Sequence, residues 1–204
     1  MINSYDALTL GHYEKILQIP KDLPDIDYRV KVLAVITGKT EDDILDQPLA
    51  DTQAMAREMN FLLEPLPKCN GKSLAASYQL GSFTLVPSKD VRKWTTAQYI
   101  DYQTYMGADT VKLPELFSCV LVPKGHTYGN GYDVAEVIAA IREHFTVMQA
   151  QEVSAFFLRK FVRSIRHILT CSALALRRTK EGRALAKRIR AVLPSLKGGD
   201  GLLM

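Results

Sequence analysis

Apolar residues in the first part of the chain recur at the three- and four-residue spacing of amphipathic helices. Thr9 is a suitable N-cap for a first helix, which is expected to run to about Gln18 and to stop before Pro20. A second helix is expected to open after Pro24 and to end at Gly38, a position that favours a left-handed residue. The pattern therefore predicts two short helices with defined ends.

Capping signals mark two further helices. Thr40 followed by Asp43 is close to a capping box, and it predicts a short helix to about Leu45. The residues from 49 to 63 have the periodicity of another amphipathic helix, which Pro65 would end.

The pattern changes between residues 66 and 94. Tyr78 to Leu80 and Phe83 to Val86 alternate around Gly81-Ser82, which predicts a small β-hairpin near residues 77–87. The helical pattern then returns with three start signals. Thr95-Thr96 are expected to cap a helix from residue 97 to about 106, Pro114 to start one over residues 113–120, and Asp133 to cap one that ends near residue 145.

The longest periodic run opens at Thr146 or Val147 and continues to about Leu193, with a break near residues 179–182. Pro194 stops it. The predicted fold is therefore mainly α: a compact helical body with a small β-hairpin and a long basic C-terminal helix. Residues 1–150 would form the body, and residues 151–204 would form the helical extension.

Charge is divided unevenly between these two parts. Residues 151–204 carry twelve Lys and Arg against three Asp and Glu, a net of +9. Residues 1–150 carry fourteen against nineteen, a net of −5, and the whole-chain value of +4 hides this difference. An acidic body joined to a basic segment is typical of proteins that dock onto a partner.

Basic residues of the extension form the candidate partner-docking surface. They are Arg177, Arg178, Lys180, Arg183, Lys187, Arg188 and Arg190. Nucleic-acid phosphates, an acidic protein surface and an anionic membrane surface would all suit them, as would the acidic body of a second copy. Aromatic residues for base stacking are absent after Phe161, which argues against single-strand recognition. A helix face that meets only solvent is the plain alternative.

Two glycine-containing segments resemble nucleotide-binding motifs only in part. Asn70-Gly71-Lys72-Ser73 has the end of a phosphate-binding loop, but Leu66 stands where the first glycine is required, so a surface turn is expected. Gly125 to Gly131 has three spaced glycines without the surrounding βαβ unit of a dinucleotide site. A mobile loop, or one that pairs with a neighbouring subunit, is expected there.

No residue pattern indicates catalysis, a metal or a cofactor. The four histidines have no ligand spacing, and no serine lies in a nucleophile elbow. The three cysteines, Cys69, Cys119 and Cys171, form no CxxC pair and are expected to be reduced thiols in a cytoplasm. The N-terminus lacks the features of a secretory signal, and charged residues interrupt every long apolar run, so no membrane span is expected.

Three segments together resemble a known group of proteins. They are residues 8–13 (LTLGHY), residues 30–42 (VKVLAVITGKTED), and residues 80–86 followed by 94–103 (WTTAQYIDYQ), with AFFL at 155–158 in addition. The chain resembles small virion or tail-assembly proteins of tailed double-stranded DNA phages of gut Bacteroidetes, including crAss-like phages. The resemblance covers roughly residues 8 to 160 and leaves the basic extension out. It implies a virion or tail-assembly component without enzymatic activity.

The leading hypothesis is a non-enzymatic structural protein of a phage virion, in a neck or tail ring or carried inside the particle. It would be assembled in the host cytoplasm, dock to other virion proteins in an oligomeric assembly, and contact DNA, if at all, without sequence preference. Two alternatives stay open. One is a tail assembly chaperone that is absent from the mature virion, and the other is a cytoplasmic nucleic-acid-binding protein.

Overall fold

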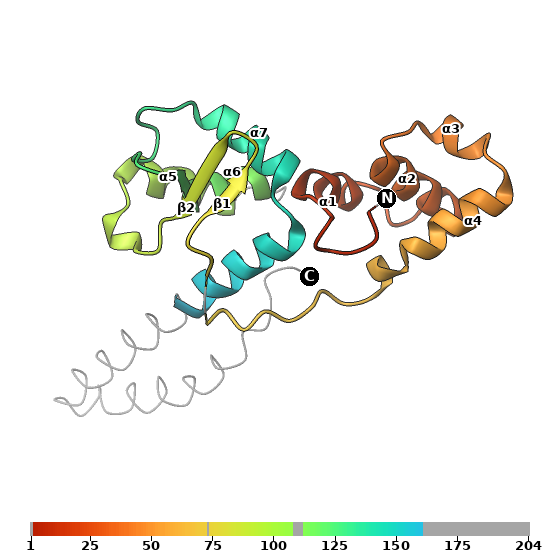
Figure 1. The fold of residues 1–204 in the computed structure, drawn as a ribbon, viewed down its shortest axis with the longest axis horizontal. Coiled ribbons are helices and arrows are strands. Elements are labelled where there is room, and N and C mark those ends of the chain that lie inside the picture. The colour runs from red at the N-terminus through yellow and green to blue at the C-terminus, as the bar shows by residue number, and fades with distance from the viewer. Residues whose placement is uncertain (1, 73, 108–111, 161–204) are drawn as a thin grey trace, which may run out of the picture. The chain divides into compact units, whose positions relative to one another are not determined.

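A computed structural model describes residues 2–72, 74–107 and 112–160 (Figure 1). This part of the chain is mainly helical with one small antiparallel sheet, as the sequence predicts. The chain divides into two compact units: Met1–Pro67 with Ala75–Ala150, and Lys68–Leu74 with Gln151–Met204. The predicted continuation of the basic helix beyond residue 160 lies outside the described residues.

The first two helices begin and end where their capping residues predict. Helix α1 (Leu10–Leu17) starts after Thr9, whose hydroxyl oxygen accepts a hydrogen bond from the backbone N–H of His12. Helix α2 (Asp25–Thr37) ends at Gly38, which has a φ of 70°. A side chain at this left-handed position would be strained, so glycine gives the chain a low-cost exit from the helix.

Helix α3 (Glu41–Leu45) is held by a complete capping box. The backbone N–H of Asp43 donates to the Thr40 hydroxyl at 3.1 Å, and the backbone N–H of Thr40 donates to the Asp43 carboxylate at 3.0 Å. The Thr40 hydroxyl also donates to the Asp43 carboxylate at 2.6 Å, and this bond, followed by the bond from the Thr40 backbone N–H, lowers the pKa of the Asp43 carboxyl. An aspartate therefore closes the box in place of the commoner glutamate.

The fourth helix is shorter than the sequence predicts. Helix α4 covers Leu49–Glu58, and a 3₁₀ helix, η1 (Asn60–Leu63), replaces its expected last turn. The backbone of Glu64 is extended, as expected of a residue that precedes a proline. A tighter 3₁₀ turn ends the helix before this restricted position, which periodicity alone does not reveal.

A three-stranded antiparallel sheet follows, in the order β1-β2-β3. Strands β1 (Tyr78–Leu80) and β2 (Phe83–Pro87) form the predicted hairpin. Strand β3 (Leu121–Pro123) is the third strand and pairs with β2, with Pro123 opposite Leu85. The run around Leu121 is too short to identify as a strand by its own pattern, so its pairing partner was not predicted.

Three further α-helices of the larger unit lie around this sheet in Figure 1. A short 3₁₀ helix, η2 (Val91–Lys93), precedes α5 (Thr96–Met106), which Thr95 caps as predicted. Helix α6 (Leu113–Val120) begins with a proline in its first turn. Helix α7 (Val134–His144) starts after Asp133, and a further helix runs through residues 147–160 of the described chain. Helices α5, α6 and α7 and the helix at residues 147–160 start where their sequence signals predict.

Phe145 lies at the centre of the larger unit and is fully buried. Its ring makes edge contacts with Tyr78, with centroids 5.2 Å apart, and with Phe117, with centroids 5.5 Å apart. Its carbonyl oxygen accepts a hydrogen bond from the backbone N–H of Leu10 at 2.8 Å. Phe145 therefore joins the sheet, α6 and the start of α1 in one core.

A charged group ties α1, α6 and α7 together. The Arg142 guanidinium donates to the carboxylates of Glu14 at 3.2 Å and Glu115 at 3.0 Å. Gly11 allows α1 to approach this arginine, because a Cβ at this position would lie 2.7 Å from the Arg142 carbonyl oxygen. The absence of a side chain at Gly11 and the length of Arg142 together set the distance between the two helices.

Candidate functional site

The seven basic residues that the sequence nominates for docking lie outside the described residues. They are Arg177, Arg178, Lys180, Arg183, Lys187, Arg188 and Arg190. The candidate sites that the structure does describe lie on the body of the chain.

Helix α3 and the first turn of α4 carry a set of acidic residues. Residues 41–51 contain five Asp and Glu and no Lys or Arg. Asp42, Asp46 and Asp51 are exposed, and none of them forms an ion pair with another described residue. By contrast, Glu41 pairs with Lys31, whose ammonium lies 2.6 Å from its carboxylate.

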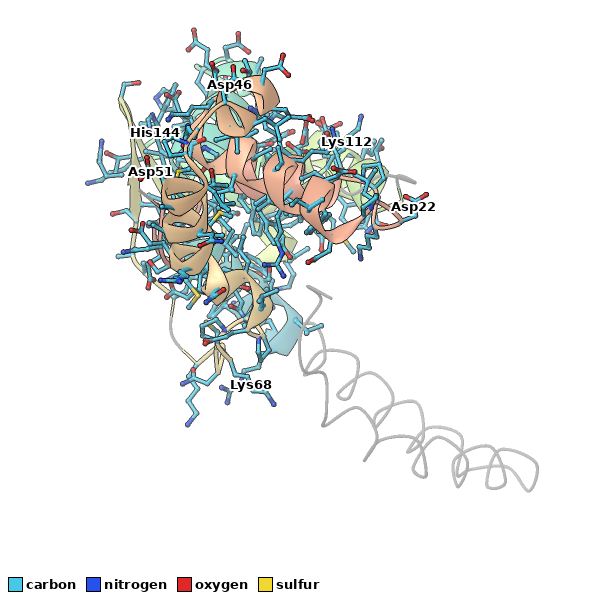
Figure 2. The ribbon with its side chains drawn as sticks, turned by 90° about the vertical axis from the view of Figure 1, so that its right-hand side faces the viewer. Asp22, Asp46, Asp51, Lys68, Lys112 and His144 are labelled. Atoms are coloured by element: carbon cyan, nitrogen blue, oxygen red, sulfur yellow. The ribbon has the colours of Figure 1, made fainter. Side chains whose placement is uncertain are left out.

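Two exposed leucines lie among these acids. Leu45 is 65% exposed at the end of α3, and Leu49 is 71% exposed at the start of α4. Figure 2 looks onto these helices, with Asp46 at the top of the view and Asp51 beside α4. We name Asp42, Leu45, Asp46, Leu49 and Asp51 the α3–α4 face. These exposed acidic and apolar residues all lie within residues 42–51, and such a combination suits a basic amphipathic partner.

A second candidate is an open cleft of about 620 Å³ at the end of the sheet. It lies between the last residues of β2, the start of α5 and the loop that follows β3. Lys93, Lys124 and His126 are exposed along its edge. Its charge would favour an anionic group, although these side chains reach solvent, where their attraction is strongly screened.

The lining of the cleft includes a polar residue that is buried. Gln98 is 3% exposed, and its side-chain amide donates to the Cys119 carbonyl oxygen at 2.6 Å. This bond joins α5 to the end of α6 and satisfies a buried carbonyl group. Gln98 therefore has a structural role that its position in the sequence did not indicate.

A buried Tyr128, Asp101 and Cys119 cluster lies beside Gln98. The Tyr128 hydroxyl donates to the Asp101 carboxylate at 2.9 Å and lies 3.8 Å from the Cys119 sulfur. Burial raises the pKa of the Cys119 thiol to about 11, and burial with these same neighbours also raises the pKa of Tyr128. Both groups are neutral at pH 7, so the thiol lacks the thiolate form that a nucleophile needs.

The glycine-rich loop after β3 folds back on itself. Gly125, Gly129 and Gly131 all have positive φ, and Thr127 and Asn130 form an isolated antiparallel bridge. The backbone N–H of Asn130 donates to the Thr127 carbonyl oxygen at 2.9 Å. The glycines therefore allow a tight turn. Strands β2 and β3 beside the loop are antiparallel, whereas the strands of a dinucleotide-binding unit are parallel.

Gly71, in the segment that resembles a phosphate-binding loop, lies against a helix backbone. Gly71 is buried with a φ of 59°, and a Cβ there would lie 2.4 Å from the Ala155 carbonyl oxygen. The Arg159 guanidinium also donates to the Asn70 carbonyl oxygen at 3.2 Å. The expectation of a simple surface turn was therefore incomplete. Close packing on residues 151–160 explains this glycine without a phosphate.

The described residues contain no group of three or more His, Cys, Asp or Glu that could hold a metal ion. His12 instead contacts the Thr9 hydroxyl through its Nδ1 at 2.7 Å, and burial lowers its pKa. Across the same part of the chain, no helix is both long and apolar enough to cross a membrane.

Comparisons with known proteins leave the family open. No protein-family model matches the chain, and neither the curated proteins nor the solved structures include a match.

Sequence reasoning missed the α3–α4 face as a site. Asp42 and Asp43 lie in the first turn of α3 and are exposed, which agrees with the capping signal at Thr40. The available signal was an acidic run that also contains leucines at positions 45 and 49. The structure adds that both leucines are exposed, which residue spacing does not establish.

Proposed function

We propose that this chain is a non-enzymatic structural protein of a phage virion, in a neck or tail ring or inside the particle, which docks through its basic C-terminal segment. The observation that carries the proposal is the separation of charge. Residues 151–204 have a net charge of +9, whereas residues 1–150 have a net charge of −5. Surfaces of opposite charge attract one another, so this distribution favours docking onto a partner surface.

The body supports docking through its own surface chemistry. Three of its exposed acids, Asp42, Asp46 and Asp51, form no ion pair with a described residue, and Leu45 and Leu49, close to them in the sequence, are exposed. Charges in water act over a Debye length of about 8 Å at physiological salt, so such groups act mainly where surfaces meet. The basic segment and the acidic body therefore offer two different surfaces for assembly.

Charge reversal in the basic segment tests this function. Replacing Arg177, Arg178, Lys187 and Arg188 with Glu changes the charge by eight units and should remove the protein from purified phage particles. The matched control reverses four exposed basic residues of the body that lie outside both candidate sites: Lys21, Arg29, Arg57 and Lys112. Incorporation of the segment variant at the wild-type level would contradict the proposal.

Mass spectrometry of purified particles tests the virion assignment separately. A structural protein should be present in a fixed number of copies, and that number would distinguish a ring from internal cargo. A protein that is required for tail formation yet absent from particles would be a tail assembly chaperone instead. Affinity of the isolated protein for duplex DNA that falls steeply with salt would favour the nucleic-acid-binding alternative.

A further inference from the structure

The α3–α4 face contains acids that form no ion pair and leucines that are mostly exposed within the described chain. Asp42 and Asp51 lie in the first turns of α3 and α4, where the helix dipole favours a negative charge. Asp46 is the C-cap of α3, where the same dipole disfavours one. Helix electrostatics therefore explains two of the acids and leaves Asp46 unexplained.

The exposed leucines of this face also lack an internal role. Leu45 and Leu49 are 65% and 71% exposed, whereas Ile44 of α3 is only 1% exposed. Apolar side chains gain stability only from the surface that they remove from water, so these two leucines contribute little to folding. Both stand in the sequence among the unpaired acids Asp42, Asp46 and Asp51.

We propose that the α3–α4 face binds the basic segment at residues 174–190 of a second copy of this chain. The inference rests on the proposed function, because it identifies the partner of the segment through which the protein docks. Seven Lys and Arg and one Glu give this segment a net charge of +6, against the three unpaired acids Asp42, Asp46 and Asp51 of the face. The two surfaces are therefore complementary in charge.

Apolar residues match across the same pair of surfaces. The segment interleaves its basic residues with Leu174, Leu176, Leu185 and Ile189. These side chains can cover Leu45 and Leu49, while the surrounding basic groups meet Asp42, Asp46 and Asp51. An apolar centre with a charged rim is the usual arrangement of a protein interface.

A second copy fits better than nucleic acid, because the α3–α4 face would repel phosphates. Each copy carries one acidic face and one basic segment, so the contact joins two different surfaces. Such heterologous contacts repeat from copy to copy and produce a closed ring or an open filament. Self-assembly of this kind is what a ring component requires.

Two complementary variants of the full chain provide the test. The face variant carries Asp42→Lys, Asp46→Lys and Asp51→Lys, and the segment variant carries Arg177→Glu, Arg178→Glu, Lys187→Glu and Arg188→Glu. Sedimentation velocity at low salt should show oligomers for the wild type and monomers for either variant alone. Mixing the variants should restore a complex, because each supplies the surface that the other has lost.

The control for folding reverses acids elsewhere on the body. Asp6→Lys, Asp22→Lys and Glu143→Lys change the same charge at exposed positions and should leave association intact. Leu45→Ser with Leu49→Ser should weaken association at least tenfold with an unchanged circular dichroism spectrum. Oligomers of the face variant that equal those of the wild type would overturn the inference.

A fold-back contact within one chain predicts a different result. The wild type would then be a monomer, and a mixture of the two variants would form no complex, which would overturn the choice of a second copy. Particle incorporation separates this failure from failure of the proposed function. If the segment variant is lost from particles while the face variant still forms oligomers, only the inference about the α3–α4 face fails. If the segment variant enters particles at the wild-type level, the proposed function itself fails.

Discussion

Acidic residues at two places in the body have opposite surroundings. Glu14 on α1 and Glu115 on α6 are 18% and 19% exposed, and both lie against the guanidinium of Arg142. Asp42, Asp46 and Asp51 on α3 and α4 are exposed and form no ion pair with any other described residue. The first set connects three helices, whereas the second set connects nothing within the described chain.

This difference separates charge that stabilises the fold from charge that remains for a partner. A carboxylate withdrawn from water needs a cation or hydrogen-bond donors, so Glu14 and Glu115 depend on Arg142. An exposed carboxylate needs neither, and removing its charge should hardly affect folding. Stability and association should therefore respond to different acids.

Removal of Arg142 should have the largest effect on stability. Arg142→Met keeps the aliphatic stem but leaves two largely buried carboxylates without their cation, and we expect the free energy of unfolding to fall by about 2–3 kcal/mol. Urea denaturation measures this change. Arg29→Met is the control: its pair with Asp25 is 59% and 79% exposed, and a loss below about 0.5 kcal/mol is expected. Equal losses in both variants would remove the distinction between the two sets of acids.

Gly11→Ala should have the next largest effect. The new Cβ would meet the Arg142 backbone carbonyl oxygen at 2.7 Å, so α1 and α7 must separate. Alanine favours the helix by about 1 kcal/mol, yet the overpacking should still leave a net loss of about 1–2 kcal/mol. Gly107→Ala provides a matched control, because its Cβ would lie 3.3 Å from the Gln103 carbonyl oxygen and φ there is negative. A neutral Gly11→Ala would show that the α1–α7 contact is looser than described.

Alkaline pH should destabilise the protein through Cys119. Its pKa is about 11 in the folded state against 9.0 for an unperturbed thiol, so above pH 9 the unfolded chain loses this proton first. Stability is therefore complete below pH 9 and falls between pH 9 and 11, by on the order of 1 kcal/mol at pH 10. Denaturation under reducing conditions should show a smaller pH dependence for Cys119→Ala. Cys69→Ala, at a partly exposed thiol, should change it less. An unchanged slope in Cys119→Ala would contradict this assignment.

Neutralising the α3–α4 face should have the smallest effect on folding. Asp42→Asn, Asp46→Asn and Asp51→Asn together should change the free energy of unfolding by no more than about 1 kcal/mol, because exposed substitutions usually lie within about 0.5 kcal/mol each. The same variant should lose self-association at low salt. Thermal unfolding at a concentration where the wild type is monomeric measures the first effect by itself. A loss comparable to that of Arg142→Met would assign these acids to the fold.

The sequence predicted local structure well where the signal itself is local. Thr9, Thr40, Thr95 and Asp133 each cap the helix that follows, and Gly81-Ser82 turns the hairpin. Strand β3 depends on pairing with β2, about thirty-five residues earlier in the chain, so its three residues gave little evidence alone. The 3₁₀ turn η1 was missed for a related reason, since periodicity does not resolve how a helix ends.

Sites were harder to predict than helices. The contact of Arg142 with Glu14 joins residues 128 positions apart, and no spacing rule links them. Gly71 looked like part of a turn, but its conformation and its contact with Ala155 depend on packing within the smaller unit. Exposure of Leu45 and Leu49 likewise depends on which helix faces meet. The predicted docking residues at 177–190 lie outside the described residues, so that prediction stands on sequence alone.

Zero-length crosslinking between copies tests the central claim most directly. A carbodiimide joins carboxylates to lysines in direct contact, and an equal mixture of light and isotopically heavy protein shows whether a crosslink joins two copies. The α3–α4 face should crosslink through Asp42, Asp46 or Asp51 to Lys180 or Lys187, and half of these products should carry mixed labels. Crosslinks that join only residues of the same label, or that leave the α3–α4 face unmodified, would contradict the claim.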